Sequence, residues 1–294
     1  RLVFDQHGQR RVGIALRDLK SFGAARESYE RALQLNPQFS IAMVNLSALS
    51  LDEDRPEDAL RWANQARAHD PKDSNALNYA GVALRKLSRH SEALSVFEEA
   101  LKLQPQNPRL WTNYGNTLRE LNQYSEALAA QDRALQIQPN FAEAHNNRGK
   151  ILTEMGRIEE GIEAYSRAIA LSSQFQDAHW NKALALLLSG DWTEGFRLYE
   201  YRRSRANKIL SISSVPEWMG EDLREKKILV TTEQGIGDLF QFVRFVKPLH
   251  ELGALVAVSC PQRLHRLMKS FTLSPIQLVD SHQANAENYD CFVP

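Results

Sequence analysis

Cysteine is nearly absent from this sequence, and so is any excess charge or long apolar run. Only Cys260 and Cys291 occur in 294 residues. So few thiols exclude a disulfide framework and favour a reducing compartment, so we expect a cytoplasmic protein. The 36 basic side chains are balanced by 36 acidic ones, so no global field recruits nucleic acid. No segment approaches the ~18 consecutive apolar residues of a membrane helix, and we predict no membrane span.

What the sequence does contain is an internal repeat. Six copies align over residues 6–39, 40–73, 74–107, 108–141, 142–175 and 176–209. Small residues recur in fixed columns. The eighth position reads Gly13, Ser47, Gly81, Gly115, Gly149 and Ala183. The twentieth position reads Ala25, Ala59, Ala93, Ala127, Gly161 and Gly195.

Small residues at these positions predict pairs of antiparallel helices. Two helices approach closely only where the crossing point carries no large side chain. Large residues such as Leu84 on the first helix and Phe97 on the second would fill the remaining space. Proline ends the second helix in four copies, at Pro37, Pro71, Pro105 and Pro139. The period therefore predicts a mainly α fold, a helical solenoid over residues 1–209.

The columns resemble the tetratricopeptide repeat. This resemblance implies a right-handed α-solenoid that binds proteins, and six copies in one register make the pattern specific. The sixth copy departs from it, because Arg202 replaces the small residue of the twenty-seventh position and no proline follows. We expect the array to end there, either in a cap or in a surface meant for something else.

Asparagine recurs at the sixth position of the first helix, at Asn45, Asn113, Asn147 and Asn181. Asparagine is a poor helix former, so its recurrence needs a reason. A carboxamide offers a donor and an acceptor together, which predicts a protein or peptide held by its backbone in the concave groove. The column resembles the asparagine ladder of O-linked N-acetylglucosamine transferase, whose asparagines hold a peptide main chain. The alternative is that the asparagines bond between adjacent repeats.

Two histidines, His145 and His179, occupy the fourth position of the fifth and sixth copies. The fourth copy has Trp111 there. A position that accepts a bulky ring favours a core filler over a metal ligand, and no other histidine or cysteine lies at ligand spacing nearby. We predict no metal site.

The helical period disappears after residue 209, and residues 210–227 are predicted to be a linker. Short β-branched runs then alternate with helical stretches. Strands are predicted over residues 228–232, 254–259, 276–279 and 290–293, and helices over residues 239–252 and 261–271. This alternation predicts a partial Rossmann-like α/β domain over residues 228–294, too short for a complete nucleotide-binding domain.

The segment "EQGIGD" follows the first predicted strand, at the edge where parallel sheets bind ligands. Gly235 and Gly237 allow a sharp turn and a close approach to a ligand, and the next helix offers unpaired N–H groups to an anion. Glu233 and Gln234 are expected to fix the loop or to contact an acceptor. These four residues predict a phosphate or sugar loop.

The succession of "LYEYR", "PEWMG" and "ILVTTEQGIGDLFQFVRF" after the repeats resembles bacterial proteins that join tetratricopeptide repeats to a heptosyltransferase-like domain. Heptosyltransferases are inverting glycosyltransferases of the GT-B class, built from two facing Rossmann domains. The resemblance implies that Asp238 is the base that deprotonates the acceptor hydroxyl, as an inverting transfer requires. The alternative is a structural role, since an aspartate in the first turn of a helix is favoured by capping and by the helix dipole.

Two functions follow from these patterns. The first is a repeat scaffold that presents a polypeptide acceptor to a glycosyltransferase domain, with a nucleotide sugar as donor substrate and no other cofactor. The second is a scaffold for protein complexes without catalysis. The resemblance implies a second Rossmann domain that the chain does not contain before Pro294, so we expect this chain to be inactive alone.

Overall fold

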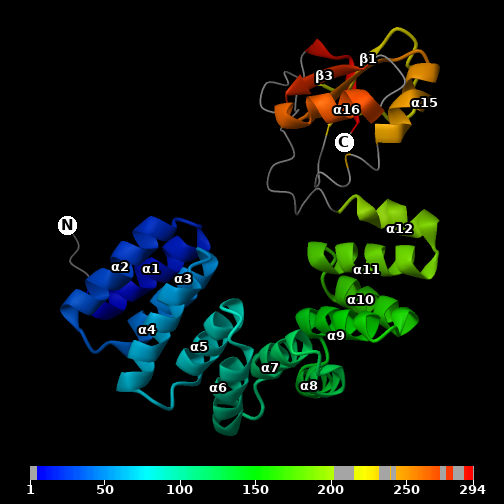
Figure 1. Ribbon diagram of the computed structural model, residues 1–294. Coiled ribbons are helices and arrows are strands. Elements are labelled where there is room, and N and C mark those ends of the chain that lie inside the picture. The colour runs from blue at the N-terminus through cyan, green and yellow to red at the C-terminus, as the bar shows by residue number, and fades with distance from the viewer. Residues whose placement is uncertain are drawn as a thin grey trace. The chain divides into compact units, whose positions relative to one another are not determined.

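The computed structural model describes residues 5–201, 215–231, 239, 243–271, 276–280 and 288–293. The chain divides into two units, residues 1–201 and residues 202–294, each held by its own internal contacts. The described part of the first unit is helical, and that of the second unit contains a small sheet (Figure 1).

The first unit is a tandem array of helices. The helices are α1 (Gln6–Asp18), α2 (Phe22–Leu35), α3 (Ser40–Asp52), α4 (Pro56–His69), α5 (Ser74–Lys86), α6 (His90–Leu103), α7 (Pro108–Glu120), α8 (Tyr124–Ile137), α9 (Ala142–Glu154), α10 (Ile158–Leu171), α11 (Gln176–Ser189) and α12 (Trp192–Tyr199). The odd-numbered helices begin at the first residue of the six sequence copies. The predicted helical solenoid is therefore confirmed.

The two helices of a copy meet where a small residue faces a large ring. A Cβ atom built on Gly81 of α5 would lie 2.6 Å from the ring of Phe97 in α6. Phe97 is fully buried, so its ring has no room to move aside. The same arrangement pairs Gly13 with Tyr29 and Gly149 with Tyr165. The eighth position is thus small because a buried ring lies directly over it.

The turn between the two helices of a copy always has a left-handed residue at the same position. The angle φ is 57° at Lys20, 55° at Asp54, 59° at Ser88, 61° at Asn122, 78° at Gly156 and 91° at Gly190. Only glycine adopts this conformation without a steric penalty, which is roughly 1–2 kcal/mol for other residues. Four residue types other than glycine accept it here, so the packing of the helix pair imposes the conformation.

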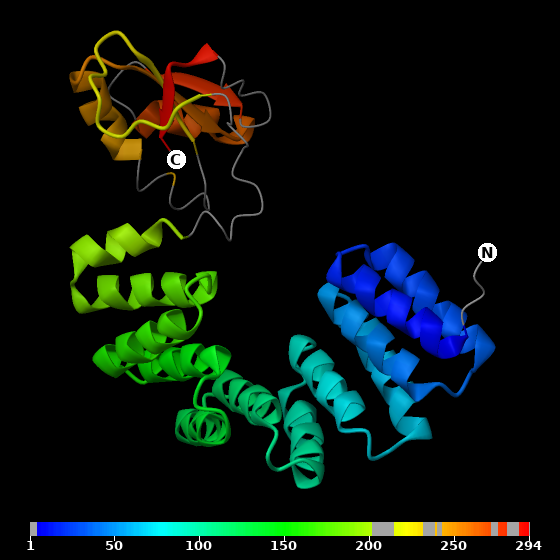
Figure 2. The same cartoon turned by 180° about the vertical axis from the view of Figure 1, so that it is seen from behind.

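Successive copies stack through apolar side chains of their second helices. Leu94 of α6 packs on the cluster that contains Leu118 of α7, and Ile162 of α10 packs on the cluster that contains Leu186 of α11. The first helices of successive copies also contact one another, more closely than the second helices do. A stack curves toward the side where its elements lie closest, so the first helices line the inner side of the curve (Figures 1 and 2).

The second unit contains a small parallel sheet. Its described strands are β1 (Lys227–Val230), β2 (Leu255–Cys260), β3 (Gln277–Asp280) and β4 (Cys291–Val293), in the order β3-β2-β1-β4. In β1, Ile228 lies opposite Val256 of β2 on one side and Cys291 of β4 on the other. A small parallel sheet is therefore present, and the partial Rossmann-like domain stays a prediction.

Short helices accompany the strands, and the core lies between them. The described helical segments are η1 (Val243–Phe245), α15 (Val246–Glu251), η2 (Gln262–Leu264) and α16 (His265–Phe271). Ile228, Val258 and Met268 are almost completely buried in one apolar cluster. Apolar residues follow one another along β2, as expected of a parallel strand covered on both faces.

Part of the predicted linker packs on this sheet. Leu223 is 2% exposed and belongs to the apolar cluster, and Trp218 packs against it. The backbone N–H of Trp218 donates to the carbonyl oxygen of Phe292 at 2.9 Å, which covers the open side of β4. The sequence pattern did not indicate this role, because the two apolar residues stand alone among polar ones.

Candidate functional site

The asparagines of the sixth column lie on α3, α7, α9 and α11, and two of them bond between repeats. Nδ2 of Asn113 donates to Oδ1 of Asn78 at 2.8 Å, and Nδ2 of Asn181 donates to Oδ1 of Asn146 at 2.9 Å. Donor and acceptor are 35 residues apart in both pairs, so each bond joins one repeat to the one before it. The alternative of bonding between adjacent repeats thus describes Asn113 and Asn181. The sequence pattern gave no sign that Asn78 and Asn146 are their partners.

Asn45 and Asn147 lie in a different environment. Asn147 is 6% exposed and Asn45 is half-buried. Their Nδ2 atoms are buried and have no hydrogen-bond partner among the described residues. Asn78 and Asn146 occupy the fifth position of their copies. That position is Arg10 in the copy before Asn45 and Thr112 in the copy before Asn147, so neither copy offers a second carboxamide there. The column therefore holds two paired and two unpaired side chains.

A paired asparagine keeps part of its bonding capacity. Its amide nitrogen carries two N–H groups, and its carbonyl oxygen has two lone pairs. The bond from Asn113 to Asn78 uses one N–H of the donor and one lone pair of the acceptor. The inter-repeat bond thus orients the carboxamide without using up its donors and acceptors.

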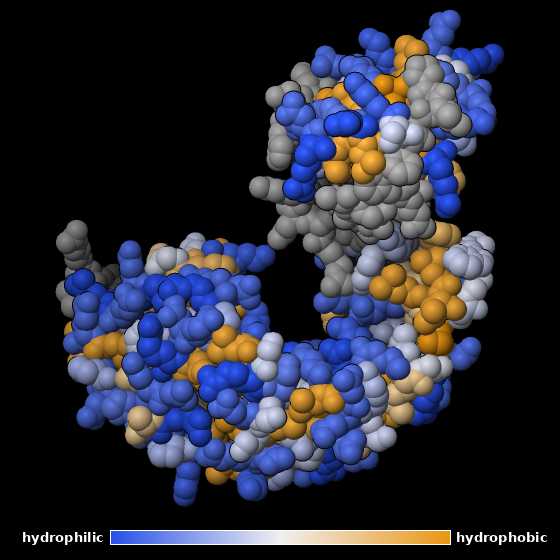
Figure 3. Space-filling model, viewed as in Figure 1, coloured by the Kyte–Doolittle hydropathy of each residue, from blue (hydrophilic) through white to orange (hydrophobic). Residues whose placement is uncertain are grey.

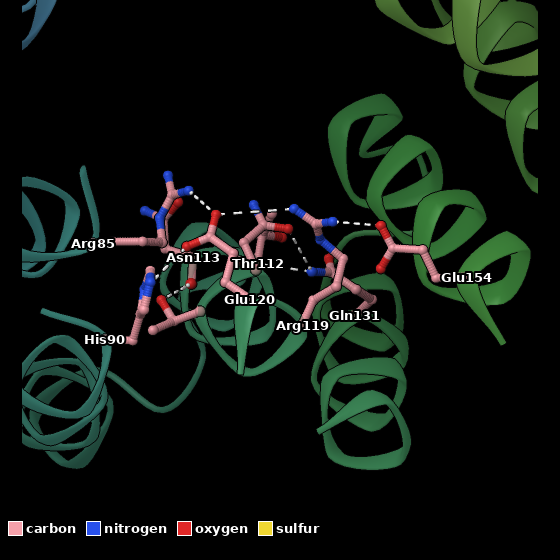
Figure 4. A network of polar contacts seen from close by, with 10 residues as sticks. Arg85, His90, Thr112, Asn113, Arg119, Glu120, Gln131 and Glu154 are labelled. Atoms are coloured by element: carbon pink, nitrogen blue, oxygen red, sulfur yellow. Dashed lines mark hydrogen bonds and ion pairs between the residues drawn. The ribbon is translucent and has the colours of Figure 1, made fainter. Parts of the chain in front are cut away.

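A ladder of ion pairs links the carboxyl ends of the first helices of successive copies (Figure 4). Arg85 Nη1 lies 2.8 Å from Glu120 Oε1, and Arg119 Nη1 lies 2.6 Å from Glu154 Oε1. The first two copies are joined in the same way, with Arg17 Nε 2.5 Å from Asp52 Oδ2. Partly exposed pairs of this kind stabilise by roughly 0.2–1 kcal/mol each, so the ladder sets the joint geometry more than the stability.

The fourth copy has a polar residue where four of the other copies have an aromatic ring. Gln131 of α8 is fully buried, and its Nε2 donates to the carbonyl oxygen of Thr112 at 3.1 Å (Figure 4). Gln131 Oε1 and Thr112 Oγ1 are buried without a hydrogen-bond partner among the described residues. The equivalent residues of other copies include Tyr29, Phe97 and Tyr165. A glutamine in an aromatic column was a signal in the sequence that the analysis did not use.

The two histidines of the fourth column make the contact that tryptophan makes in the fourth copy. Nε2 lies 2.9 Å from the carbonyl oxygen of Pro139 for His145, and 2.9 Å from that of Ser173 for His179. Trp111 Nε1 donates to the carbonyl oxygen of Pro105 at the same distance. These contacts explain both histidines without a metal. Among the residues that the structure describes, no group of three or more His, Cys, Asp or Glu side chains could hold a metal ion.

The predicted phosphate or sugar loop, with Glu233, Gln234, Gly235, Gly237 and the predicted base Asp238, lies outside the described residues. The strand before it is described. The strand order turns at β1, because β2 and β3 lie on one side of it and β4 on the other. The chain therefore leaves the carboxyl end of β1 at the point where the strand order reverses.

A cavity of about 900 Å³ borders the opposite edge of the sheet. Its described lining includes Lys227, Leu255 and Gln277, which stand at the amino ends of β1, β2 and β3. Parallel sheets bind ligands beyond the carboxyl ends of their strands, so we assign no site to this cavity.

Sequence models of tetratricopeptide repeats match most of the array. A model described as "TPR repeat" matches residues 115–156 and 149–190, and models described as "Tetratricopeptide repeat" match residues 16–79, 51–108 and 96–129. The chain is a tetratricopeptide repeat protein over this region. None of the described helices has the length and apolar character needed to cross a membrane.

Curated relatives match over the repeats. The chain is 32% identical over 88 residues to the small glutamine-rich tetratricopeptide repeat-containing protein 2 of Mycosarcoma maydis, covering 30% of this chain and 25% of that protein. It is 30% identical over 97 residues to the protein O-mannosyl-transferase Tmtc3 of Drosophila melanogaster, covering 33% of this chain and 10% of that protein. The matched segments thus span a quarter or less of these relatives.

Solved structures share the fold of the array. A thermophilic tetratricopeptide repeat protein of Thermus thermophilus is 25% identical with a TM-score of 0.57, covering 62% of this chain and 99% of that one. The APC/C hetero-tetramer Cut9–Hcn1 has a chain with a TM-score of 0.64 at 16% identity, covering 71% of this chain and 42% of that one. The second likeness concerns the fold alone.

Proposed function

We propose that the array is a protein-binding scaffold that holds an extended segment of a partner along its inner side. The column of carboxamides is the observation that carries this proposal. Asn113 and Asn181 are oriented by bonds to the preceding repeat and keep free donors and acceptors. An extended peptide presents alternating N–H and C=O groups, which carboxamides match without reading side chains.

The proposal predicts recognition of the peptide backbone. Peptides selected from a random library on the immobilised full chain supply the probe. Methylation of successive backbone nitrogens of a selected peptide should weaken its binding, whereas most single side-chain changes should not. The triple variant Asn113→Ala, Asn147→Ala and Asn181→Ala should keep its helical circular dichroism and lose the peptide.

A matched control separates binding from packing. The double variant Asn78→Ala and Asn146→Ala removes the acceptors of the inter-repeat bonds and leaves the sixth-column carboxamides in place. Each lost bond destabilises by about 1 kcal/mol in either variant. Binding that weakens in the double variant, which loses only the orientation of two carboxamides, and fails in the triple variant supports the proposal. Equal loss in both would reduce the column to a packing role.

A second candidate function concerns the C-terminal unit as the first part of a glycosyltransferase-type Rossmann domain, to which the repeats present an acceptor. The strand order supports it. The order β3-β2-β1-β4 is the order of the first four strands of a doubly wound sheet, and ligands bind where such an order reverses. In the sequence, the segment with Asp238 comes directly after β1.

The enzymatic candidate is tested on the longest protein that the gene encodes, with a nucleotide sugar as donor and hydrolysis or transfer as the readout. Loss of a catalytic base lowers the rate by about a hundredfold or more, so Asp238→Asn should do so while peptide binding persists. Asp222→Asn, an exposed aspartate that pairs with Arg224, is the control. Activity that Asp238→Asn leaves unchanged removes the catalytic role, and no activity with any donor leaves the scaffold.

The cysteines support the proposed cytoplasmic location. Cys260 and Cys291 are both free and buried, on strands β2 and β4 that flank β1. Burial raises the pKa of both thiols, which keeps them protonated and unreactive. Such cysteines act as small apolar core residues and need no disulfide.

A further inference from the structure

The repeat array ends in an exposed apolar surface. Leu184 of α11 is 42% exposed, and Trp192 and Phe196 of α12 are 60% and 57% exposed. We call these three residues the end face. Apolar residues gather over the α11–α12 hairpin on the side shown in Figure 3.

The end face occupies positions at which apolar residues of some earlier copies pack toward the next repeat. Ile14 and Phe22, at the positions of Leu184 and Trp192, pack on the cluster that contains Leu46 and Leu49 of α3. At the position of Phe196, Leu60, Leu94 and Ile162 pack on clusters that include Leu84, Leu118 and Leu186 respectively. Each of these clusters includes residues from the first helix of the following copy.

The sixth copy enlarges this surface. A polar residue would be expected on the outer side of a terminal repeat, because exposed stacking surfaces lower solubility. The chain instead has Leu184 where the two preceding copies have Asn116 and Lys150, and the largest side chain of its column at Trp192. The rings of Trp192 and Phe196 are stacked with centroids 6.2 Å apart, which holds them in one arrangement.

We propose that the end face docks an amphipathic helix of another protein, which takes the place of a first helix. The contacts between repeats inside the array indicate which side chains this docking helix must carry. It carries apolar side chains about one or two turns apart on one face, as Leu46 and Leu49 do in α3 and as Leu77 and Leu84 do in α5. This site is distinct from the inner side of the array and does not depend on the peptide-binding proposal.

A second copy of this chain fits the end face less well. Helices α3, α5, α7, α9 and α11 are already covered by the copies before them. The remaining first helix, α1, has Val12 and the small Ala15 at the positions of Leu46 and Leu49. It would leave much of Trp192 and Phe196 uncovered.

The test uses the full chain and a helical peptide of known register. The probe is a fluorescent peptide with the sequence of Ser74–Lys86, stapled on its polar face because so short a helix is marginal alone. We expect saturable binding by fluorescence anisotropy. The double variant Trp192→Glu and Phe196→Glu should weaken it about tenfold or more, as loss of two aromatic anchors does. Both residues are exposed, so the variant should keep its circular dichroism.

Two controls are matched to this design. Leu35→Glu changes a leucine of α2 that is 53% exposed outside the end face, and it should leave binding unchanged. A peptide with Leu77→Glu and Leu84→Glu should not bind. The proposal is overturned by absent binding, by binding that the double variant retains, or by equal binding of the altered peptide. It is also overturned if the free chain sediments as an oligomer that the double variant dissociates, because a second copy then occupies the face.

Discussion

The two units of this chain differ in the range of the contacts that hold them. In the array, the side-chain bonds between repeats join residues 27 to 35 apart, from Arg26 with Glu53 to Arg85 with Glu120. In the sheet unit, the Lys227 N–H donates to Asp290 Oδ2 at 2.8 Å across 63 residues, and β4 pairs with β1. A destabilising substitution in an array of neighbouring repeats should therefore affect mainly the repeats around it. In a sheet whose first and last strands pair with one another, a substitution should destabilise the whole sheet.

The largest effect is expected in the sheet unit. Ile228→Ala removes a fully buried side chain from the central strand and should destabilise the unit by about 3 kcal/mol. Hydrogen exchange should quicken in β1, β2 and β4 together and stay unchanged in α1 to α12. Leu255→Ala, at a side chain that is 54% exposed, should change little. Faster exchange in the array as well would show that the two units open together.

A smaller and more local effect is expected from Gly81→Ala. Its Cβ would lie 2.6 Å from the Phe97 ring, an overpacking that costs about 2 kcal/mol. Gly23→Ala in α2 is the opposite control, because no heavy atom lies within 4 Å and alanine is the better helix former. Urea unfolding followed by circular dichroism should show a loss for the first variant and a gain of about 0.5–1 kcal/mol for the second. A loss in both would mean that the facing ring does not explain the small column.

Alkaline pH should weaken the array through two of its buried tyrosines. Burial raises the pKa of Tyr29 and of Tyr165 from 10.0 to about 12. The unfolded chain therefore loses these protons first as the pH rises. The stability from the neutral phenols is complete below pH 10 and is lost toward pH 12, by about 2 kcal/mol for each tyrosine. The double variant Tyr29→Phe and Tyr165→Phe should flatten this loss in thermal unfolding, whereas Tyr124→Phe, whose hydroxyl bonds at the surface, should not.

The smallest effects are expected at the left-handed turns, which only the array has in a regular column. Ser88→Gly should stabilise the array by about 0.5 kcal/mol, because the relieved strain exceeds the added chain entropy. Gly156→Ser is the reverse change in the fifth copy and should destabilise by about 1 kcal/mol. Thermal unfolding measures both. Shifts of the same sign would show that the turns do not force the conformation.

The array was readable from the sequence because each copy repeats one local solution. Gly81 and its column indicated a close helix approach, and the structure shows the ring of Phe97 as its cause. The partners of the asparagines were not readable in the same way. Asn78 stands one column before Asn113 and one repeat earlier, and only the offset between stacked copies brings the two side chains within 2.8 Å.

The sequence predicted the strands and helices of the sheet unit but not the order of its strands. Alternating strands and helices indicated parallel strands, close to the bounds of β1, β2, β3 and β4. The same alternation is compatible with many strand orders, because a crossover can place the next strand on either side of the sheet. Trp218 and Leu223 also gave no periodic signal, and they gained a role only by packing on the sheet.

The sequence by itself thus determined the helix pairs, their period and the copy at which the period fails, since these depend on residues close along the chain. The tertiary structure decided which carboxamides are paired, which positions carry left-handed backbone, and that β4 lies beside β1. It also left Leu184, Trp192 and Phe196 exposed at positions that are covered in earlier copies. These features depend on how finished elements stack, and stacking joins residues that no local pattern connects.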